Sequence, residues 1–184
     1  LGHVGTYRRR MPVSLERMVE NALDWEHLPH LHHGSFAAIE CLDAGPWGLR
    51  ARTEDLRGRL SLLELRLDRT LHRWITRNLE GPNAGAEIWT HVFELAPRSL
   101  EVVVDFFVPG IDDERREAVG RVYAGLYERL YDEDKRMMCE RQAELDRRAG
   151  ASEQDRLALG PATALELPLT VTFAGRTWRI RHGA

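Results

Sequence analysis

Histidines and carboxylates are concentrated in one short stretch of the sequence, from Glu20 to His33. The stretch holds four histidines and three carboxylates: Glu20, Asp24, Glu26, His27, His30, His32 and His33. Imidazole and carboxylate groups bind divalent transition metals and also serve as the acids and bases of enzymes. This stretch is therefore where we first look for chemistry in the chain.

His27 and His32 are the pair best placed to share one metal ion. On an unbroken helix, residues five apart point in directions that differ by roughly 140°, which is too divergent. Pro29 lies between them and is predicted to break or kink the helix, so that both rings converge. Asp24 precedes His27 by three residues on the same helix face. We therefore predict that Asp24 accepts the second ring N–H of His27 and fixes its orientation.

A third ligand is predicted on a long helix that begins at Asp112 or Asp113 and ends near Arg148. Its inward face repeats at steps of three and four residues: Val119, Val122, Leu126, Leu130, Asp134 and Met138. A carboxylate in line with core residues needs a partner, because burying an unpaired charge is costly. We predict that His27, His32 and Asp134 hold one Fe(II) ion and leave positions open for O₂ or water.

Other interpretations of these residues stay open. Zinc accepts the same ligands, and a zinc-activated water would suit a hydrolase. Asp134 would otherwise form an ion pair with Lys135 or Arg136. His30 and His33 are predicted to be surface residues. The sequence has no HExxH motif, which argues against a zincin-type protease.

Composition limits the class of protein. The 184 residues carry a formal net charge of −3, with arginines scattered rather than clustered, so nothing points to nucleic acid as a partner. No apolar run is long enough to span a membrane. Cys41 and Cys139 are far apart and outside any CxxC motif, so we expect reduced thiols and a cytoplasmic protein.

Most of the remaining chain has the periodicity of strands. Ser14 is predicted to cap a helix that runs to about residue 28, and residues 6–13 before it are predicted to be a short strand or arm. Antiparallel strand pairs are predicted at 36–42 with 47–56 and at 87–95 with 100–108. The spacing of leucines in 60–78 fits a helix as well as strands, and strands are favoured there because the neighbouring segments are strands. An antiparallel sheet followed by one long helix indicates an α+β fold.

The C-terminal part differs in character, so we divide the chain into three. Residues 1–150 are predicted to form the main domain, 151–165 a linker, and 166–184 a hairpin. Within the hairpin, Leu167–Phe173 and Arg176–Arg181 are expected to pair across a turn at Ala174 and Gly175.

The site residues resemble a known family. Asn21-x-x-Asp24-x-x-His27-x-x-x-x-His32 resembles the iron motif of the Rieske non-haem iron oxygenases, and Glu133-Asp134-Lys135 resembles the segment that carries their carboxylate ligand. The resemblance covers about residues 10–148 and implies a START-like, helix-grip catalytic domain.

The resemblance also implies roles and a reaction. It makes His27, His32 and Asp134 the ligands of mononuclear Fe(II), with Asp24 and Asn21 as catalytic residues beside them. Asp24 resembles an aspartate that links the iron to a Rieske cluster on a neighbouring subunit of a homotrimer. The implied reaction is O₂-dependent hydroxylation or demethylation, by mono- or dioxygenation, of an aromatic or alicyclic substrate.

The sequence departs from that family in one respect. A Rieske [2Fe–2S] centre needs CxH and CxxH pairs, and the chain has neither. The cluster and its electrons would then come from a domain, ferredoxin or reductase outside the chain, and the protein alone would be inactive. The chain would be an excised domain, a split subunit, or a truncated protein whose final hairpin begins a Rieske domain.

A different class of function is a START-like protein that binds a hydrophobic small molecule without catalysis. The same fold serves both classes, so the fold cannot choose between them. The metal ligands discriminate, because a pure carrier has no reason to bury Asp134 opposite two histidines.

Overall fold

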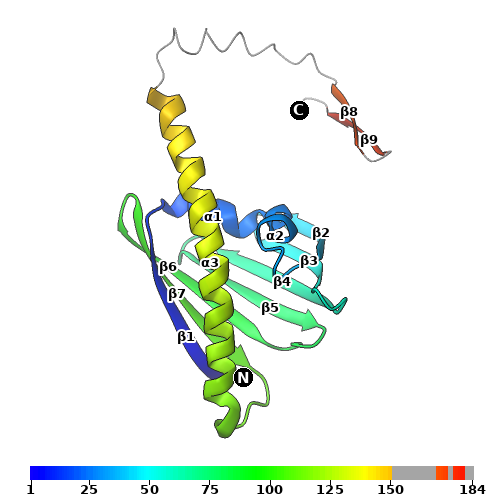
Figure 1. The fold of residues 1–184 in the computed structure, drawn as a ribbon, viewed down its shortest axis with the longest axis vertical. Coiled ribbons are helices and arrows are strands. Elements are labelled where there is room, and N and C mark those ends of the chain that lie inside the picture. Colours follow the sequence, from blue (N-terminus) through cyan, green and yellow to red (C-terminus); the bar gives the residue numbers. More distant parts are fainter. Residues whose placement is uncertain (151–168, 174–175, 181–184) are drawn as a thin grey trace. The chain divides into compact units, whose positions relative to one another are not determined.

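Seven antiparallel strands form one sheet, and a long helix lies across one of its faces (Figure 1). The computed structural model describes residues 1–150, 169–173 and 176–180. Two units are distinguished by their internal contacts, Leu1–Ala143 and Glu144–Ala184. The first unit contains the sheet and the candidate site.

The strand order in the sheet is β1-β7-β6-β5-β4-β3-β2. The strands are β1 (Gly2–Met11), β2 (Ala38–Gly45), β3 (Gly48–Glu54), β4 (Leu60–Asp68), β5 (Arg73–Glu80), β6 (Glu87–Ala96) and β7 (Ser99–Val108). The predicted strand pairs are confirmed, including the segment 60–78, which forms β4 and β5. Of the two alternatives predicted for residues 6–13, a short strand or an arm, the strand is confirmed: β1 extends from Gly2 to Met11 and pairs along β7.

Alternation along the strands separates the core from the opposite face of the sheet. On β7, every second side chain from Leu100 to Phe106 is buried: Leu100, Val102, Val104 and Phe106 are each 0% exposed. This period of two is what a sheet with one packed face requires. The packed face receives α1 (Leu15–Leu23) and α3 (Asp113–Gly150), which contribute Met18, Tyr131 and Met138 to the core.

The first helix begins as predicted but ends earlier. The Ser14 side chain accepts a hydrogen bond from the backbone N–H of Arg17 at 3.3 Å, and this cap starts α1. The helix ends at Leu23, where Asp24 leaves the helical region with φ −80° and ψ 82°. A 3₁₀ turn, η1 (Trp25–His27), and a short helix, α2 (Leu28–Leu31), follow.

The predicted break at Pro29 is therefore wrong. Pro29 lies in the first turn of α2, where a missing N–H costs nothing because that donor has no partner within the helix. The chain changes direction at Asp24, five residues earlier.

The long helix α3 has its predicted start, and its predicted inward face is confirmed in part. The Asp112 side chain accepts a hydrogen bond from the Arg115 N–H at 2.8 Å. Val122 is 72% exposed, so its predicted place in the stripe is wrong, whereas Asp134 and Met138 are buried. Val119 packs on the core as predicted, and further inward positions belong to Gly120, which is buried, and to three tyrosines: Tyr123, Tyr127 and Tyr131.

The predicted α+β, helix-grip fold is confirmed: an antiparallel sheet is folded against one long helix. Cys41 and Cys139 are free thiols. Within the described residues, no helix combines the length and apolar character needed to cross a membrane. In the second unit, β8 (Leu169–Phe173) and β9 (Arg176–Ile180) pair antiparallel. The predicted linker, 151–165, and the predicted turn at 174–175 lie outside the described residues.

Helix α3 lies close to β1 at Gly120, and this contact generates a stability prediction. A Cβ atom added to Gly120 would lie 2.0 Å from the carbonyl oxygen of Val4. We expect Gly120→Ala to destabilise the protein by at least about 2 kcal/mol, because backbone must move to relieve the overlap.

Gly125 lies on the same helix and supplies the control, since a Cβ there meets nothing within 4 Å. Gly125→Ala should be neutral or stabilising by up to about 1 kcal/mol through helix propensity. Urea unfolding of both variants measures this. Equal stability of the two would contradict the close packing of α3 on β1.

A second prediction concerns Glu64, which lies on the sheet face opposite to its neighbours Leu63 and Leu65. Its carboxylate accepts hydrogen bonds from Arg66 at 2.7 Å and from Arg50 at 2.6 Å. These bonds lower the pKa of Glu64 from 4.5 to about 2. A lowered pKa means that the bonds stabilise the fold above pH 4.5 and lose this effect as the pH falls towards 2.

We expect Glu64→Gln to reduce the free energy of unfolding at pH 7 by about 1–2 kcal/mol, a value discounted for the exposed arginines. The deficit should shrink as the pH is lowered from 4.5 to 2. Glu40→Gln is the control, because Glu40 and its partner Arg52 are both exposed. A Glu64→Gln deficit that is constant from pH 7 to pH 2 would exclude a charge effect.

Candidate functional site

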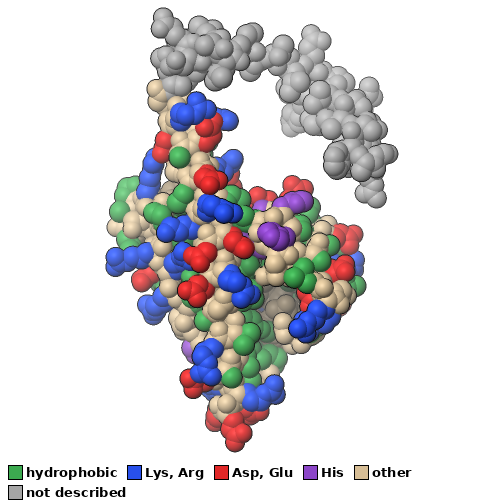
Figure 2. Space-filling model, in the orientation of Figure 1, with side chains coloured by type: hydrophobic (Ala, Val, Ile, Leu, Met, Phe, Trp, Pro, Cys, Tyr) green, Lys and Arg blue, Asp and Glu red, His purple; other side chains and the backbone are tan. Residues whose placement is uncertain are grey.

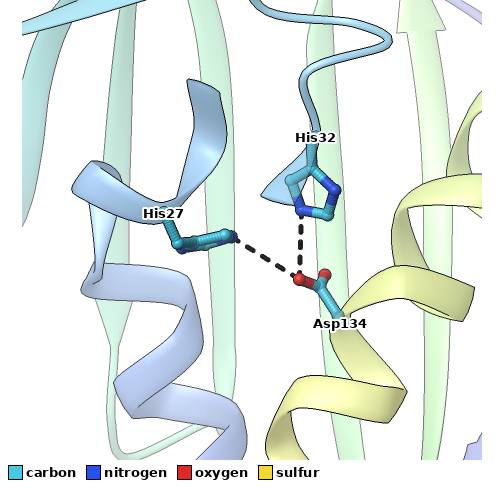
Figure 3. A group of neighbouring side chains, drawn as sticks. All are labelled: His27, His32 and Asp134. Carbon is cyan, nitrogen blue, oxygen red and sulfur yellow. Dashed lines mark ion pairs between the residues drawn. The ribbon is translucent and has the colours of Figure 1, made fainter. Parts of the chain in front are cut away.

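His27, His32 and Asp134 converge although more than one hundred residues separate Asp134 from the histidines (Figure 3). Asp134 Oδ1 lies 3.0 Å from His32 Nε2 and 3.5 Å from His27 Nε2. One donor atom from each residue lies within 4.8 Å of the other two. Donors that share one ion at about 2.1 Å lie roughly 3 to 3.5 Å apart, so the carboxylate already has suitable distances to both rings.

The two histidines lie at the ends of two successive short helical turns that follow the bend at Asp24. His27 ends η1, and His32 follows α2, with its N–H bonded to the carbonyl of Leu28 at 3.0 Å. The two rings have centroids 5.1 Å apart and planes inclined by 71°. Two short helical turns of different kinds therefore replace the divergent directions of a straight helix.

Each ring is held from behind by an oxygen acceptor. His27 Nδ1 is hydrogen-bonded to the backbone carbonyl of Asp24, while the Asp24 carboxylate is 4.0 Å away. His32 Nδ1 lies 2.6 Å from Glu133 Oε2. Both rings consequently direct Nε2, their other nitrogen, towards Asp134.

The three side chains of this cluster are almost completely shielded from solvent, and their contacts shift the pKa values of Asp134 and His32. The side chains of His27, His32 and Asp134 are 10%, 2% and 9% exposed. Burial tends to raise the pKa of Asp134, but the two imidazoles outweigh it and the pKa is lowered. Burial tends to lower the pKa of His32, but hydrogen bonding to Asp134 and Glu133 outweighs it and the pKa is raised.

His32 poses a problem of proton balance. Its two ring nitrogens face two carboxylates, and a neutral imidazole has one N–H to donate. One nitrogen would then face an acceptor with its lone pair. A doubly protonated ring, a protonated carboxyl group or a cation at Nε2 would satisfy this arrangement. Asp134 Oδ1 also has no well-aligned N–H donor, although both rings are near.

A cavity of about 170 Å³ lies beside these residues, between the sheet and the helices. Its wall is mostly apolar, with side chains such as Leu49, Leu63 and Trp74 from the sheet. Asn21 also lines it, 8% exposed, with Oδ1 lacking a hydrogen-bond partner. The cavity therefore combines a mostly apolar wall with polar groups from Asn21 and from the histidine–aspartate cluster.

The other residues of the Glu20–His33 stretch do not converge on the cluster. Glu20 pairs with Arg17 and Arg141, and Glu26 is exposed. His30 and His33 are exposed, and histidine side chains are visible at the surface over α2 (Figure 2). Asp134 is paired with imidazoles rather than with Lys135 or Arg136.

Sequence reasoning missed Glu133, Tyr127 and Tyr131. Glu133 precedes Asp134 directly, so the helix period alone would turn it away from the site. Tyr127 and Tyr131 line the cavity, and burial raises the pKa of both. Tyr131 follows Tyr127 by four residues and precedes Asp134 by three, and this spacing was a usable signal because it continues one helix face.

The sequence matches no protein-family model and no curated protein significantly. Solved structures share the fold. A START superfamily protein from Mycobacterium smegmatis is 16% identical with a TM-score of 0.62, covering 76% of this chain and 99% of its own. The Zhui aromatase/cyclase from Streptomyces sp. R1128 is 17% identical with a TM-score of 0.56, covering 82% and 99%.

Norcoclaurine synthase from Thalictrum flavum, solved in complex with dopamine and hydroxybenzaldehyde, is 15% identical with a TM-score of 0.55 and coverages of 73% and 85%. At these identities the likeness concerns the fold alone. The structural relatives are START-like proteins, not Rieske oxygenase catalytic domains. The predicted identification as a Rieske-type oxygenase subunit, with its mono- or dioxygenase activity, is therefore wrong. Proteins of many functions share one fold, so a short motif on a helix-grip fold does not suffice to identify an activity.

Proposed function

We propose that this chain binds a small, largely apolar molecule in its cavity and a divalent metal ion beside it, held by His27, His32 and Asp134. The observation that carries the proposal is Asp134 Oδ1, a buried carboxylate oxygen within 3.5 Å of two imidazole nitrogens and without an aligned donor. A carrier that needs only apolar walls gains nothing from this costly group.

The cavity suggests the size of the ligand. An apolar cavity of about 150 Å³ accommodates benzene, so about 170 Å³ suits a molecule built on one six-membered ring. The apolar wall would bury its body, and polar atoms such as those of Asn21 and Thr90 line the same cavity. Apolar walls supply affinity, while a few polar groups fix orientation.

The donor set suits Fe(II) or Zn(II) equally. Three protein ligands would leave positions open, and the ion would act there as a Lewis acid on a bound oxygen atom. His32 would coordinate through Nε2 because Glu133 holds Nδ1, and His27 likewise because the Asp24 carbonyl holds Nδ1. The chain's own contribution is to orient both rings and to keep bulk water from the apolar wall.

Metal content tests the first half of the proposal. Protein stripped with a chelator and reloaded anaerobically with Fe(II), or with Zn(II), should retain about one ion per chain. Asp134→Ala should lose it, because a two-imidazole site binds far more weakly. Elemental analysis after desalting gives the answer.

His30→Ala is the matched control, since His30 is an exposed histidine three residues from His27. It should retain the ion. Retention by Asp134→Ala, or loss in His30→Ala with retention in His32→Ala, would mean that the ion lies elsewhere. If the wild type retains no metal, the chain is a carrier without a metal site.

Ligand binding tests the second half. Toluene, a probe of one ring, should shift the indole N–H resonances of the cavity residues Trp25 and Trp74. Ala22 lines the cavity, so Ala22→Phe should fill it and weaken toluene binding at least about tenfold. Ala37→Phe, at an exposed position outside the cavity, should not. Equal binding by both variants would reject this cavity.

A further inference from the structure

We propose that Glu133 is a positioning residue for the metal site. Its carboxylate fixes the His32 ring so that Nε2, and not Nδ1, is offered to the ion. The inference rests on the proposed metal site and adds a residue that is not among its ligands.

The geometry separates Glu133 from the ligands. Glu133 Oε2 lies 2.6 Å from His32 Nδ1, on the side of the ring opposite to Asp134. Only His27, His32 and Asp134 have donor atoms gathered closely enough for one ion among the described residues. Glu133 therefore touches a ligand from behind.

Three consecutive carboxylates on α3 make three different contacts. Asp132 Oδ1 pairs with Arg9 at 2.5 Å, Glu133 pairs with His32 Nδ1, and Asp134 lies between both Nε2 atoms. Successive residues on a helix point about 100° apart. One turn of α3 thus supplies both an anchor to β1 and two opposite contacts to a single buried ring.

A carboxylate behind a histidine has two effects on coordination. As an acceptor with no proton of its own, it favours the tautomer with hydrogen on Nδ1, which leaves the Nε2 lone pair for the metal. It also makes the ring a better electron donor. The Glu133 side chain is 37% exposed, so its charge stays partly solvated and demands no further partner.

The two histidines are held differently, which provides an internal reference. His27 Nδ1 is backed by the carbonyl of Asp24, a backbone group that a substitution at Glu133 does not remove. A loss of order confined to His32 would therefore identify the Glu133 contact, whereas a general loosening of the site would affect both rings.

The test uses the full chain with Co(II) as the probe. Chelator competition gives the Co(II) affinity, and the exchangeable ring N–H protons of the two bound histidines give paramagnetically shifted resonances. Glu133→Ala should weaken Co(II) binding by about 10- to 100-fold and speed solvent exchange of the His32 Nδ1–H. The His27 resonance should persist. Glu133→Gln, which keeps an acceptor oxygen, should recover most of the affinity and slow the exchange again.

Asp132→Ala is the control for charge, because it removes a neighbouring carboxylate that touches Arg9 instead of a ligand. It should leave affinity within about threefold. Ala is a strong helix former and Glu133 is partly exposed, so Glu133→Ala should fold. Glu133→Lys, which replaces the acceptor by a donor, should weaken binding at least as much.

The outcomes separate the two proposals. If the wild type binds Co(II), Asp134→Ala does not, and Glu133→Ala binds like the wild type, the role of Glu133 is refuted and the metal site stands. Equal losses in Glu133→Ala and Asp132→Ala would also refute it, because the effect would then be general electrostatics. A wild type that binds no Co(II) would overturn the metal site and this inference together.

Discussion

A carboxylate kept away from water is the constraint around which this protein is organised. The Asp134 side chain is 9% exposed, and an isolated buried charge of that kind is too costly for a domain of marginal stability. Two imidazoles contact the Asp134 carboxylate through Nε2, and the Nδ1 atom of each imidazole contacts another oxygen acceptor. Oxygen atoms and imidazoles therefore alternate through the cluster, from Glu133 to His32 to Asp134 to His27 to the Asp24 carbonyl. Each of these contacts offsets part of the free-energy cost of burying the groups that it joins.

The fold contributes the places from which these groups meet. Helix α3 is fixed on the sheet by its contact at Gly120 with β1 and by the tyrosines that pack on the core. This fixes the depth and rotation of Asp134. The two histidines that contact Asp134 lie on the short turns after the bend at Asp24. The cavity lies beside this cluster, so a ligand there would touch the apolar sheet and the polar cluster at once.

The Rieske interpretation shows how far a motif can lead. Its spacing of Asn, Asp and His selected residues that do lie close together, and its implied helix-grip fold is present. The activity it implied has no support, because the structural relatives are START-like proteins of other kinds. The reason is general: a fold and a set of polar residues are shared by proteins with different chemistry, and what the site does depends on the groups that fill its open positions.

The sequence by itself determined the antiparallel strands, through a period of two, and the long helix, through steps of three and four residues, because both follow from local geometry. It also determined the inward position of Asp134, because a buried carboxylate must have a partner. Tertiary structure decided the rest. The bend at Asp24 in place of Pro29, the exposure of Val122 and the contact between Glu133 and His32 all depend on which surfaces pack together. Local propensity does not contain that information, since a residue one position along a helix points to a different neighbour and only the packed chain supplies that neighbour.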